Sequence, residues 1–183
     1  IWSVEINKTK TPFAPIYEDS DDYEGIITIK SSGKWTAASS DDDIVELATD
    51  SGSGVRNGEE LAFEVQPNYT EKAVSAKITV TNKDLNDTKT FTINQSAYVF
   101  TVDSSITVDD AKGKDELSVV CSGDWDVDDI SEKWLDAEAD TRNGKLEIEF
   151  DANTTGKERK ATIKIKTSDK SKITREITVI QQA

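Results

Sequence analysis

The chain has 183 residues, of which 36 are acidic and 22 basic, so its net charge of −14 repels phosphate backbones and anionic membrane surfaces alike. The absence of histidine removes the usual base of serine and cysteine triads and the commonest zinc ligand, and a single cysteine excludes an intrachain disulfide. No apolar run approaches the roughly 20 residues of a transmembrane span. We therefore expect no nucleic-acid partner, no transmembrane span in this chain, no metal and no cofactor.

Apolar and polar residues alternate along the first half of the chain, between clusters of turn-forming residues. Alternation with a period of two predicts β-strands that bury one face, and no stretch shows a long 3.6-residue period. The alternating sets, in chain order, are Trp2, Val4 and Ile6, then Ile27 and Ile29, Trp35 and Ala37, Val45 and Leu47, Leu61, Phe63 and Val65, Ala76, Ile78 and Val80, and Phe91 and Ile93.

The second half of the chain shows the same alternation. Its sets are Phe100 and Val102, then Leu117, Val119 and Cys121, Trp125 and Val127, Leu135, Ala137 and Ala139, Leu146, Ile148 and Phe150, Ala161, Ile163 and Ile165, and Ile177 and Val179. About seven strands are therefore predicted in each half.

The two halves are copies of one another. Ser32-Gly33-Lys34-Trp35 returns as Ser122-Gly123-Asp124-Trp125, and Ile93-Asn94-Gln95-Ser96-Ala97 returns as Val179-Ile180-Gln181-Gln182-Ala183. A period near 90 residues is far longer than the roughly 20–50 residues of solenoid repeats, so each copy has to bury a core of its own. The sequence predicts an all-β fold of two tandem immunoglobulin-like antiparallel β-sandwich domains of about seven strands each, over residues 1–97 and 98–183.

An Asn-Gly pair marks a turn that both copies share. Arg56-Asn57-Gly58 and Arg142-Asn143-Gly144 each lie between alternating segments, and Asn-Gly readily adopts the positive φ angles of a type I′ turn, so we expect a hairpin at both. The first copy carries extra residues before this turn, Ser51-Gly52-Ser53-Gly54. Such a stretch favours a flexible surface insertion, with a ligand-contacting loop as the alternative.

Several polar and aromatic residues are interpreted as structural. Trp35 and Trp125 share strand parity with inward apolar neighbours, so both indoles are predicted to anchor a core. Cys121 faces the same core and is expected to behave as a small apolar residue. Gln95 and Gln181 share the parity of the last core strand, and their amides are expected to bond backbone groups near the end of each sandwich.

Acidic residues cluster in the stretches 19–22, 41–43 and 124–129. The last stretch does not fit the helix-loop-helix calcium pattern, which needs glycine where Asp129 lies and glutamate where Leu135 lies. We interpret these clusters as solvated acidic surface, with a calcium site as the alternative.

Trp134 is the leading candidate for a ligand-binding residue. It shares strand parity with Asp136 and Glu138, which turns its indole toward solvent beside two carboxylates. A flat apolar ring flanked by hydrogen-bond acceptors suits the face of a sugar, whereas a twist at the strand end would return the ring to the edge of the core. Tyr69 follows a turn signal and is a weaker ligand-binding candidate, with capping of the sandwich end as its alternative role.

The order of short motifs resembles the BACON domain, a name that stands for Bacteroidetes-associated carbohydrate-binding often N-terminal. In the second copy these motifs are Ser122-Gly123-Asp124-Trp125, Trp134-Leu135, a hairpin, Asn153 ahead of Arg159-Lys160-Ala161-Thr162-Ile163, and the terminal Val179-Ile180-Gln181-Gln182-Ala183. The first copy departs from them, with Ile44-Val45 in place of Trp-Leu and Val74-Ser75 in place of the basic pair. A ligand contact at the Trp134 position is therefore not carried over to the first copy.

The resemblance implies immunoglobulin-like sandwiches in surface lipoproteins or secreted polysaccharide-degrading enzymes of gut-type bacteria, without a catalytic residue. From it we expect a non-catalytic, extracellular, carbohydrate-associated module at the bacterial outer surface. The chain contains no methionine, so a leading segment is expected before Ile1, here an N-terminal lipid anchor outside this chain. The expected partners are a polysaccharide, such as a host or dietary glycan, and other surface proteins of polysaccharide utilisation.

Three functions remain open at this point. Glycan binding predicts an exposed aromatic platform around Trp134, and a structural spacer or protein–protein adhesion module predicts none. A two-carboxylate glycosidase ranks last, because it needs two carboxyl groups roughly 5–9.5 Å apart across a cleft, and compact sandwiches with short loops rarely form one.

Overall fold

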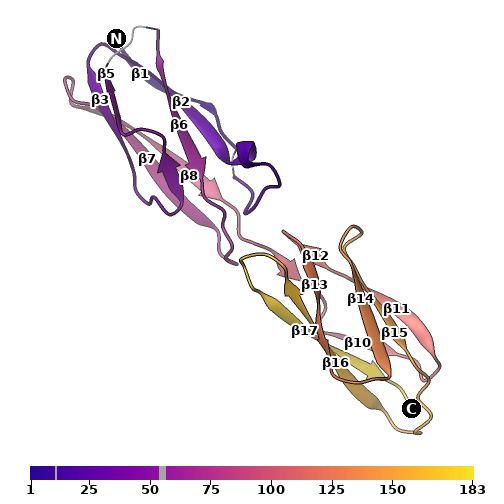
Figure 1. The fold of residues 1–183 in the computed structure, drawn as a ribbon. Coiled ribbons are helices and arrows are strands. Elements are labelled where there is room, and N and C mark those ends of the chain that lie inside the picture. Colours follow the sequence, from indigo (N-terminus) through magenta and orange to yellow (C-terminus); the bar gives the residue numbers. More distant parts are fainter. Residues whose placement is uncertain (11, 54–56) are drawn as a thin grey trace. The chain divides into compact units, whose positions relative to one another are not determined.

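The computed structural model describes residues 1–10, 12–53 and 57–183 and divides them into two compact units, Ile1–Tyr98 and Val99–Ala183 (Figure 1). Each unit is a β-sandwich with its own sheets and its own buried apolar residues. The predicted fold class, an all-β chain of two tandem immunoglobulin-like sandwiches, is confirmed.

The first unit packs two four-stranded sheets against each other. Its strands are β1 (Trp2–Lys8), β2 (Glu24–Ser31), β3 (Lys34–Ser39), β4 (Val45–Leu47), β5 (Ser51–Ser53), β6 (Glu59–Val65), β7 (Val74–Asn82) and β8 (Asp87–Gln95), with one 3-10 turn, η1 (Ser20–Tyr23). One sheet has the order β1-β2-β6-β4 and the other the order β5-β3-β7-β8. The alternating apolar residues of these strands face inward and form the core.

Trp35 and Phe13 are two of the large aromatic side chains in this core. The Trp35 side chain is 1% exposed, as predicted, and its indole Nε1 donates to Glu59 Oε2 at 3.0 Å. Phe13 is fully buried and meets Phe63 edge to face, with 6.5 Å between the ring centroids. Burial of such rings contributes several kcal/mol each, so their loss should strongly destabilise the unit.

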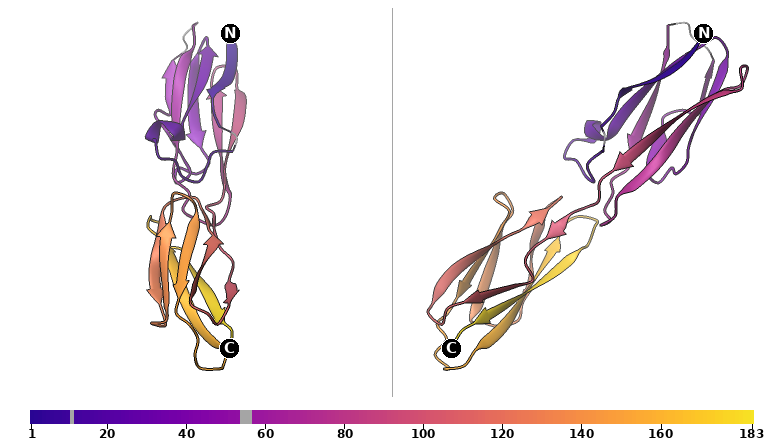
Figure 2. Two further views of the ribbon diagram at one scale, coloured as in Figure 1. Left: turned by 90° about the vertical axis from the view of Figure 1, so that its right-hand side faces the viewer. Right: turned by 180° about the vertical axis from the view of Figure 1, so that it is seen from behind.

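The second unit has the same two layers, but its strands form sheets of four, three and two strands instead of two sheets of four (Figure 2). Its strands are β9 (Phe100–Thr101), β10 (Ser105–Val108), β11 (Gly113–Ser118), β12 (Val120–Cys121), β13 (Trp125–Ile130), β14 (Leu135–Asp140), β15 (Lys145–Phe150), β16 (Arg159–Thr167) and β17 (Thr174–Gln181). The orders are β10-β17-β16-β13 and β11-β15-β14, with β12 pairing β9. Trp125 is 3% exposed, so its prediction as a core anchor is confirmed.

One strand pair differs from the antiparallel pattern that the sequence predicted. In the second unit β10 runs parallel to β17, from Ser105 opposite Thr178 to Val108 opposite Gln181. A single parallel bridge, Phe13 to Gln95, lies at the corresponding place in the first unit. Alternation cannot reveal strand direction, because it specifies only which face of a strand is buried.

The second Asn-Gly turn forms a hairpin, with different geometry from the one predicted. β14 and β15 pair in register up to Asp140 opposite Lys145, which leaves residues 141–144 as a four-residue loop. Only Gly144 of the Asn-Gly pair has a positive φ, 64°, so the type I′ turn is wrong.

In the first copy the strands on either side of Asn57-Gly58, β5 and β6, lie in different sheets, so the hairpin predicted there is wrong. β4 pairs antiparallel with β6, but the connection between them carries β5 onto the other sheet, where Gly52 lies opposite Trp35. The predicted flexible stretch is thus a strand over Ser51–Ser53, while Gly54 and Arg56 lie outside the described residues. Gly52 permits this pairing because a Cβ there would lie 2.5 Å from the Trp35 indole.

Candidate functional site

Trp134 lies immediately before β14, an outer strand of the β11-β15-β14 sheet in the second unit. It immediately precedes the buried Leu135, the first residue of β14, and is itself half-buried. The Arg159 guanidinium, from the first residue of β16 in the opposite sheet, lies over its ring at 4.2 Å from the centroid. The indole is therefore neither free in solvent nor inside the core, and one of its faces is occupied by a cation.

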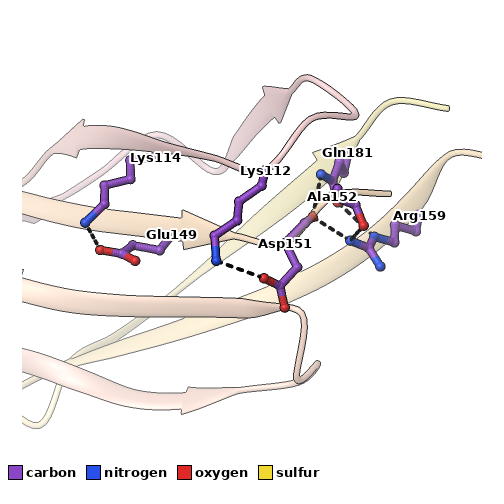
Figure 3. A network of polar contacts seen from close by, with 7 residues as sticks. All are labelled: Lys112, Lys114, Glu149, Asp151, Ala152, Arg159 and Gln181. Carbon is purple, nitrogen blue, oxygen red and sulfur yellow. Dashed lines mark hydrogen bonds and ion pairs between the residues drawn. The ribbon is translucent and has the colours of Figure 1, made fainter. Parts of the chain in front are cut away.

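Arg159 is fixed by three further acceptors (Figure 3). Its Nε donates to Gln181 Oε1 at 2.8 Å, and its Nη2 donates to the carbonyl oxygens of Asp151 at 2.8 Å and Ala152 at 3.3 Å. Gln181 is fully buried, and its Nε2 donates to Asp151 O at 2.9 Å, which confirms the predicted backbone role of this amide. The planar guanidinium thus holds the indole in one position.

The stacked pair of Trp134 and Arg159 is called the clamp here. A shallow hollow beside the clamp is lined by positively and negatively charged side chains. Lys112, Lys133, Asp136 and Asp151 line it together with Trp134. Lys112 Nζ forms an ion pair with Asp151 Oδ1 (Figure 3), and the two atoms are 3.5 Å apart. Ammonium donors and carboxylate acceptors therefore surround an aromatic edge, the combination that positions hydroxyl-rich ligands.

The structure brings together two of the four predicted ligand-binding residues. Asp136 lines the hollow with Trp134, whereas Glu138 lies further along the solvent face of β14, opposite Glu147, and is not among the lining residues. Tyr69 belongs to the first unit, where it is half-buried after the buried Asn68.

The first unit replaces both members of the clamp. Ile44 precedes the buried Val45 as Trp134 precedes Leu135, and Val74 lies opposite Gln95 as Arg159 lies opposite Gln181. Gln95 is 2% exposed, its Nε2 donates to three carbonyl oxygens, and its Oε1 has no partner among the described residues. The Trp–Arg pair is therefore a property of the second copy.

Asn68 and Asn153 each stabilise the same end of their sandwich, a role that was not predicted from the sequence. The side-chain amide of Asn68 donates to Lys72 O and Ser96 O, and that of Asn153 donates to Lys157 O and to the carbonyl oxygen of Gln182. Their Oδ1 atoms accept from the backbone and the hydroxyl of the threonine two residues later. The recurrence of Asn-x-Thr-x-Lys in both copies is the signal that points to this role.

The acidic clusters are surface features in the described part of the chain. No group of three or more Asp, Glu or Cys side chains there can hold a metal ion. Asp128 instead accepts from Lys166 Nζ at 2.6 Å, and this hydrogen bond lowers the pKa of the Asp128 carboxyl below its ordinary value. The interpretation of these clusters as solvated surface, with a calcium site as the alternative, stays a prediction.

No helix within the described ranges is long and apolar enough to cross a membrane. The model of the BACON family, described as "Putative binding domain, N-terminal", matches residues 34–96 and 124–183, one segment in each unit, and together they cover more than half of the chain. The chain belongs to the BACON family. Both copies are thus BACON domains, and the resemblance seen in the sequence is confirmed.

Solved structures similar to this BACON chain share little sequence with it. A Bacteroides ovatus GH5 xyloglucanase in complex with a XXXG heptasaccharide is 18% identical, with a TM-score of 0.39 over 60% of this chain and 22% of that chain. Cadherin domains 3-6 of protocadherin gamma B2 are 9% identical, with a TM-score of 0.39 over 100% of this chain and 49% of that chain. The BACON chain spans less than half the length of either protein. The search of curated proteins gave no match.

Proposed function

We propose that this BACON chain is a non-catalytic, carbohydrate-associated module displayed at the bacterial outer surface, and that its second copy contacts glycan at the hollow beside Trp134. The observation that supports the proposal is the half-exposed indole, fixed by Arg159 next to Lys112, Lys133 and Asp136. A fixed ring loses little conformational entropy when a sugar stacks on it, and the flanking charges can bond sugar hydroxyls.

The proposal includes no catalysis. The acidic residues that line the hollow are Asp136, Glu149 and Asp151, and Asp136 lies directly opposite Glu149 on the solvent face of one sheet. A glycosidase places its two carboxyl groups on opposite sides of the scissile bond, so neighbours on a single open face do not suit that chemistry.

The second candidate function is a spacer that presents neighbouring glycan-binding or glycan-degrading modules, or that contacts other surface proteins of polysaccharide utilisation. The first copy supports this alternative, because Ile44 and Val74 take the places of Trp134 and Arg159 there. A chain whose two copies both served glycan binding would be expected to keep the aromatic residue twice. We propose an N-terminal lipid anchor outside this chain as the attachment for either function.

Affinity electrophoresis and a glycan array, both with the full chain, test the proposal. The parent is compared with a double variant, Trp134→Ile with Arg159→Val, which gives the second copy the residues of the first. Retention by at least one polysaccharide, lost in the double variant and reduced by Asp136→Asn, supports a site at the hollow. Glu138→Gln and Tyr69→Phe test the two residues outside it and are expected to keep retention. A parent that no glycan retains favours the spacer.

A further inference from the structure

The outer edge of the β5-β3-β7-β8 sheet is formed by β8 (Asp87–Gln95). Among the described residues, Phe13 is the one that bridges this edge: its N–H donates to Asn94 O, and Ser96 N donates to Phe13 O. Even-numbered residues of β8 therefore direct their backbone groups away from β7, because successive residues of a strand alternate in this direction.

Thr88, Thr90 and Thr92 are the residues that this alternation leaves at the open edge. Thr88 N donates to its neighbour, Asp87 Oδ1, at 2.9 Å, and within the described ranges no backbone partner bonds these three residues from the outer side. Unpaired N–H and C=O groups in a row are a template for another strand.

The second unit covers one end of the equivalent edge with a strand of its own. There β10 lies along β17 from Ser105 opposite Thr178 to Val108 opposite Gln181. Ile177, which lies opposite Ile163, is fully buried, whereas Phe91, in the equivalent place of the first unit, is half-exposed. The residues that β10 covers correspond to Thr92–Gln95 of β8, where Phe13 makes a single bridge, whereas Thr174–Ile177, the counterparts of Thr88–Phe91, lie beyond the end of β10. The stretch Thr88–Phe91 is therefore an edge that neither unit covers with a strand of its own, as far as the chain is described.

The side chains along the open edge carry little charge for a chain of net charge −14. The outward residues Thr88 and Thr90 are hydroxyl neighbours of Thr81 and Thr79 on β7, at 3.2 and 3.4 Å. Asp87 and Lys89 are the charged residues of β8, and they lie 3.9 Å apart as a pair of opposite sign. Two such edges can therefore approach without net repulsion between them.

We propose that this edge pairs with the same edge of a second copy of the chain, β8 antiparallel to β8 about a two-fold axis at Thr90. In this register Thr90 lies opposite Thr90 of the second copy, and Thr88 lies opposite Thr92, so all outward backbone groups find partners. The Thr88 N–H exchanges its Asp87 acceptor for a backbone carbonyl. Cross-strand threonine pairs extend the existing hydroxyl ladder across the axis.

The residues next to Thr90 and the two ends of the β8 edge favour the register with Thr90 on the axis. Lys89 lies opposite the half-exposed Phe91 of the second copy, where the lysine stem covers the ring and its ammonium contacts the ring face. A shift toward Gln95 would collide with Phe13, which already occupies that end of the edge, and a shift the other way would run into the turn at residues 83–86.

Disulfide trapping of the full chain in a Cys121→Ser background tests both the contact and its register. Thr90→Cys places two thiols on the axis, with Cα atoms about 5.5 Å apart in a hydrogen-bonded antiparallel pair, within disulfide range. The matched variant Thr88→Cys places its thiols four residues apart along the strand, roughly 13 Å, beyond that range. The Thr90→Cys dimer should form at least about tenfold faster in the same redox buffer. Equal rates would overturn the proposal.

Sedimentation equilibrium measures the association without a cross-link. Thr90→Lys places two ammonium groups opposite each other at the axis, and Thr79→Lys adds the same charge one strand further in. Association should weaken at least about tenfold in Thr90→Lys and be kept in Thr79→Lys. A parent that stays monomeric up to about 1 mM, or equal effects of the two lysines, would refute β8 pairing. Thermal melts of each variant verify folding.

Discussion

Removal of the Arg159 side chain should destabilise the second unit and leave the first unchanged. Arg159→Val deletes the hydrogen bonds to Gln181 Oε1 and to two backbone carbonyls, and it removes the cation over Trp134. The change copies the first unit, in which valine lies opposite the equivalent glutamine, so the new side chain fits the strand.

The expected loss follows from these contacts. Hydrogen bonds from a charged donor contribute about 1.5–3 kcal/mol, and a cation over a partly exposed ring adds about 0.5–1 kcal/mol. Arg159 is itself only half-buried, which reduces the first contribution. We expect a loss of about 2 kcal/mol in the free energy of unfolding of the second unit.

Native-state hydrogen exchange is the suitable assay, because it reports each unit separately within the intact chain. Protection of the Ile163 and Val179 amides should fall, while that of their counterparts Ile78 and Ile93 in the first unit should not change. Arg159→Lys keeps the charge without the planar fork and should recover less than half of the loss. A loss below about 0.5 kcal/mol in the second unit, or an equal loss in both units, would refute the reasoning.

Three further predictions concern the second unit. Trp125→Ala should lower its stability by about 3–5 kcal/mol in urea denaturation, and an unchanged midpoint would exclude the indole from the core. Gly144→Ala should cost about 1–2 kcal/mol, more than Gly156→Ala, because both glycines have a positive φ but only Gly144 would bring its new Cβ within 2.9 Å of a backbone oxygen. The lowered pKa of Asp128 implies a stabilising contribution that is present above the carboxyl's unfolded pKa and lost as pH falls through the folded pKa. NMR titration should give a midpoint below that of an unfolded aspartate, and Lys166→Gln should raise it; an unmoved midpoint would contradict the pair.

The cores were predictable from the sequence because burial imposes alternation. Trp35, Trp125 and the inward residues around them lie where their strand parity placed them. Gln95 and Gln181 were also predictable, since a polar residue at a core position has to bond nearby backbone groups.

The clamp on Trp134 could not be predicted from the same reasoning. Parity turned the indole toward solvent, but the ring meets Arg159, which lies 25 positions further along the chain in the other sheet. Contacts of this kind depend on how two sheets meet at their edge, and alternation within one strand carries no information on that geometry. The one available signal was the joint change of two positions between the copies, to Ile44 and Val74.

The open edge of β8 was hidden for a related reason. The segment that pairs with β17 in the second copy is Ser105–Val108, and it is too short to be recognised by its own alternation. It also runs parallel to β17, whereas a hairpin joins only antiparallel strands, so no turn signal could predict this pairing. Only the paired strands themselves show that Phe13 supplies a single bridge where β10 supplies four residue pairs.

The chain has four tryptophans, so its indole N–H signals report directly on the proposed glycan contact. A two-dimensional NMR titration with a polysaccharide retained in the affinity screen should shift the Trp134 signal and leave those of the buried Trp35 and Trp125 in place. Shifts confined to other indoles, or an unmoved Trp134 signal at saturating glycan, would contradict a binding site at this hollow.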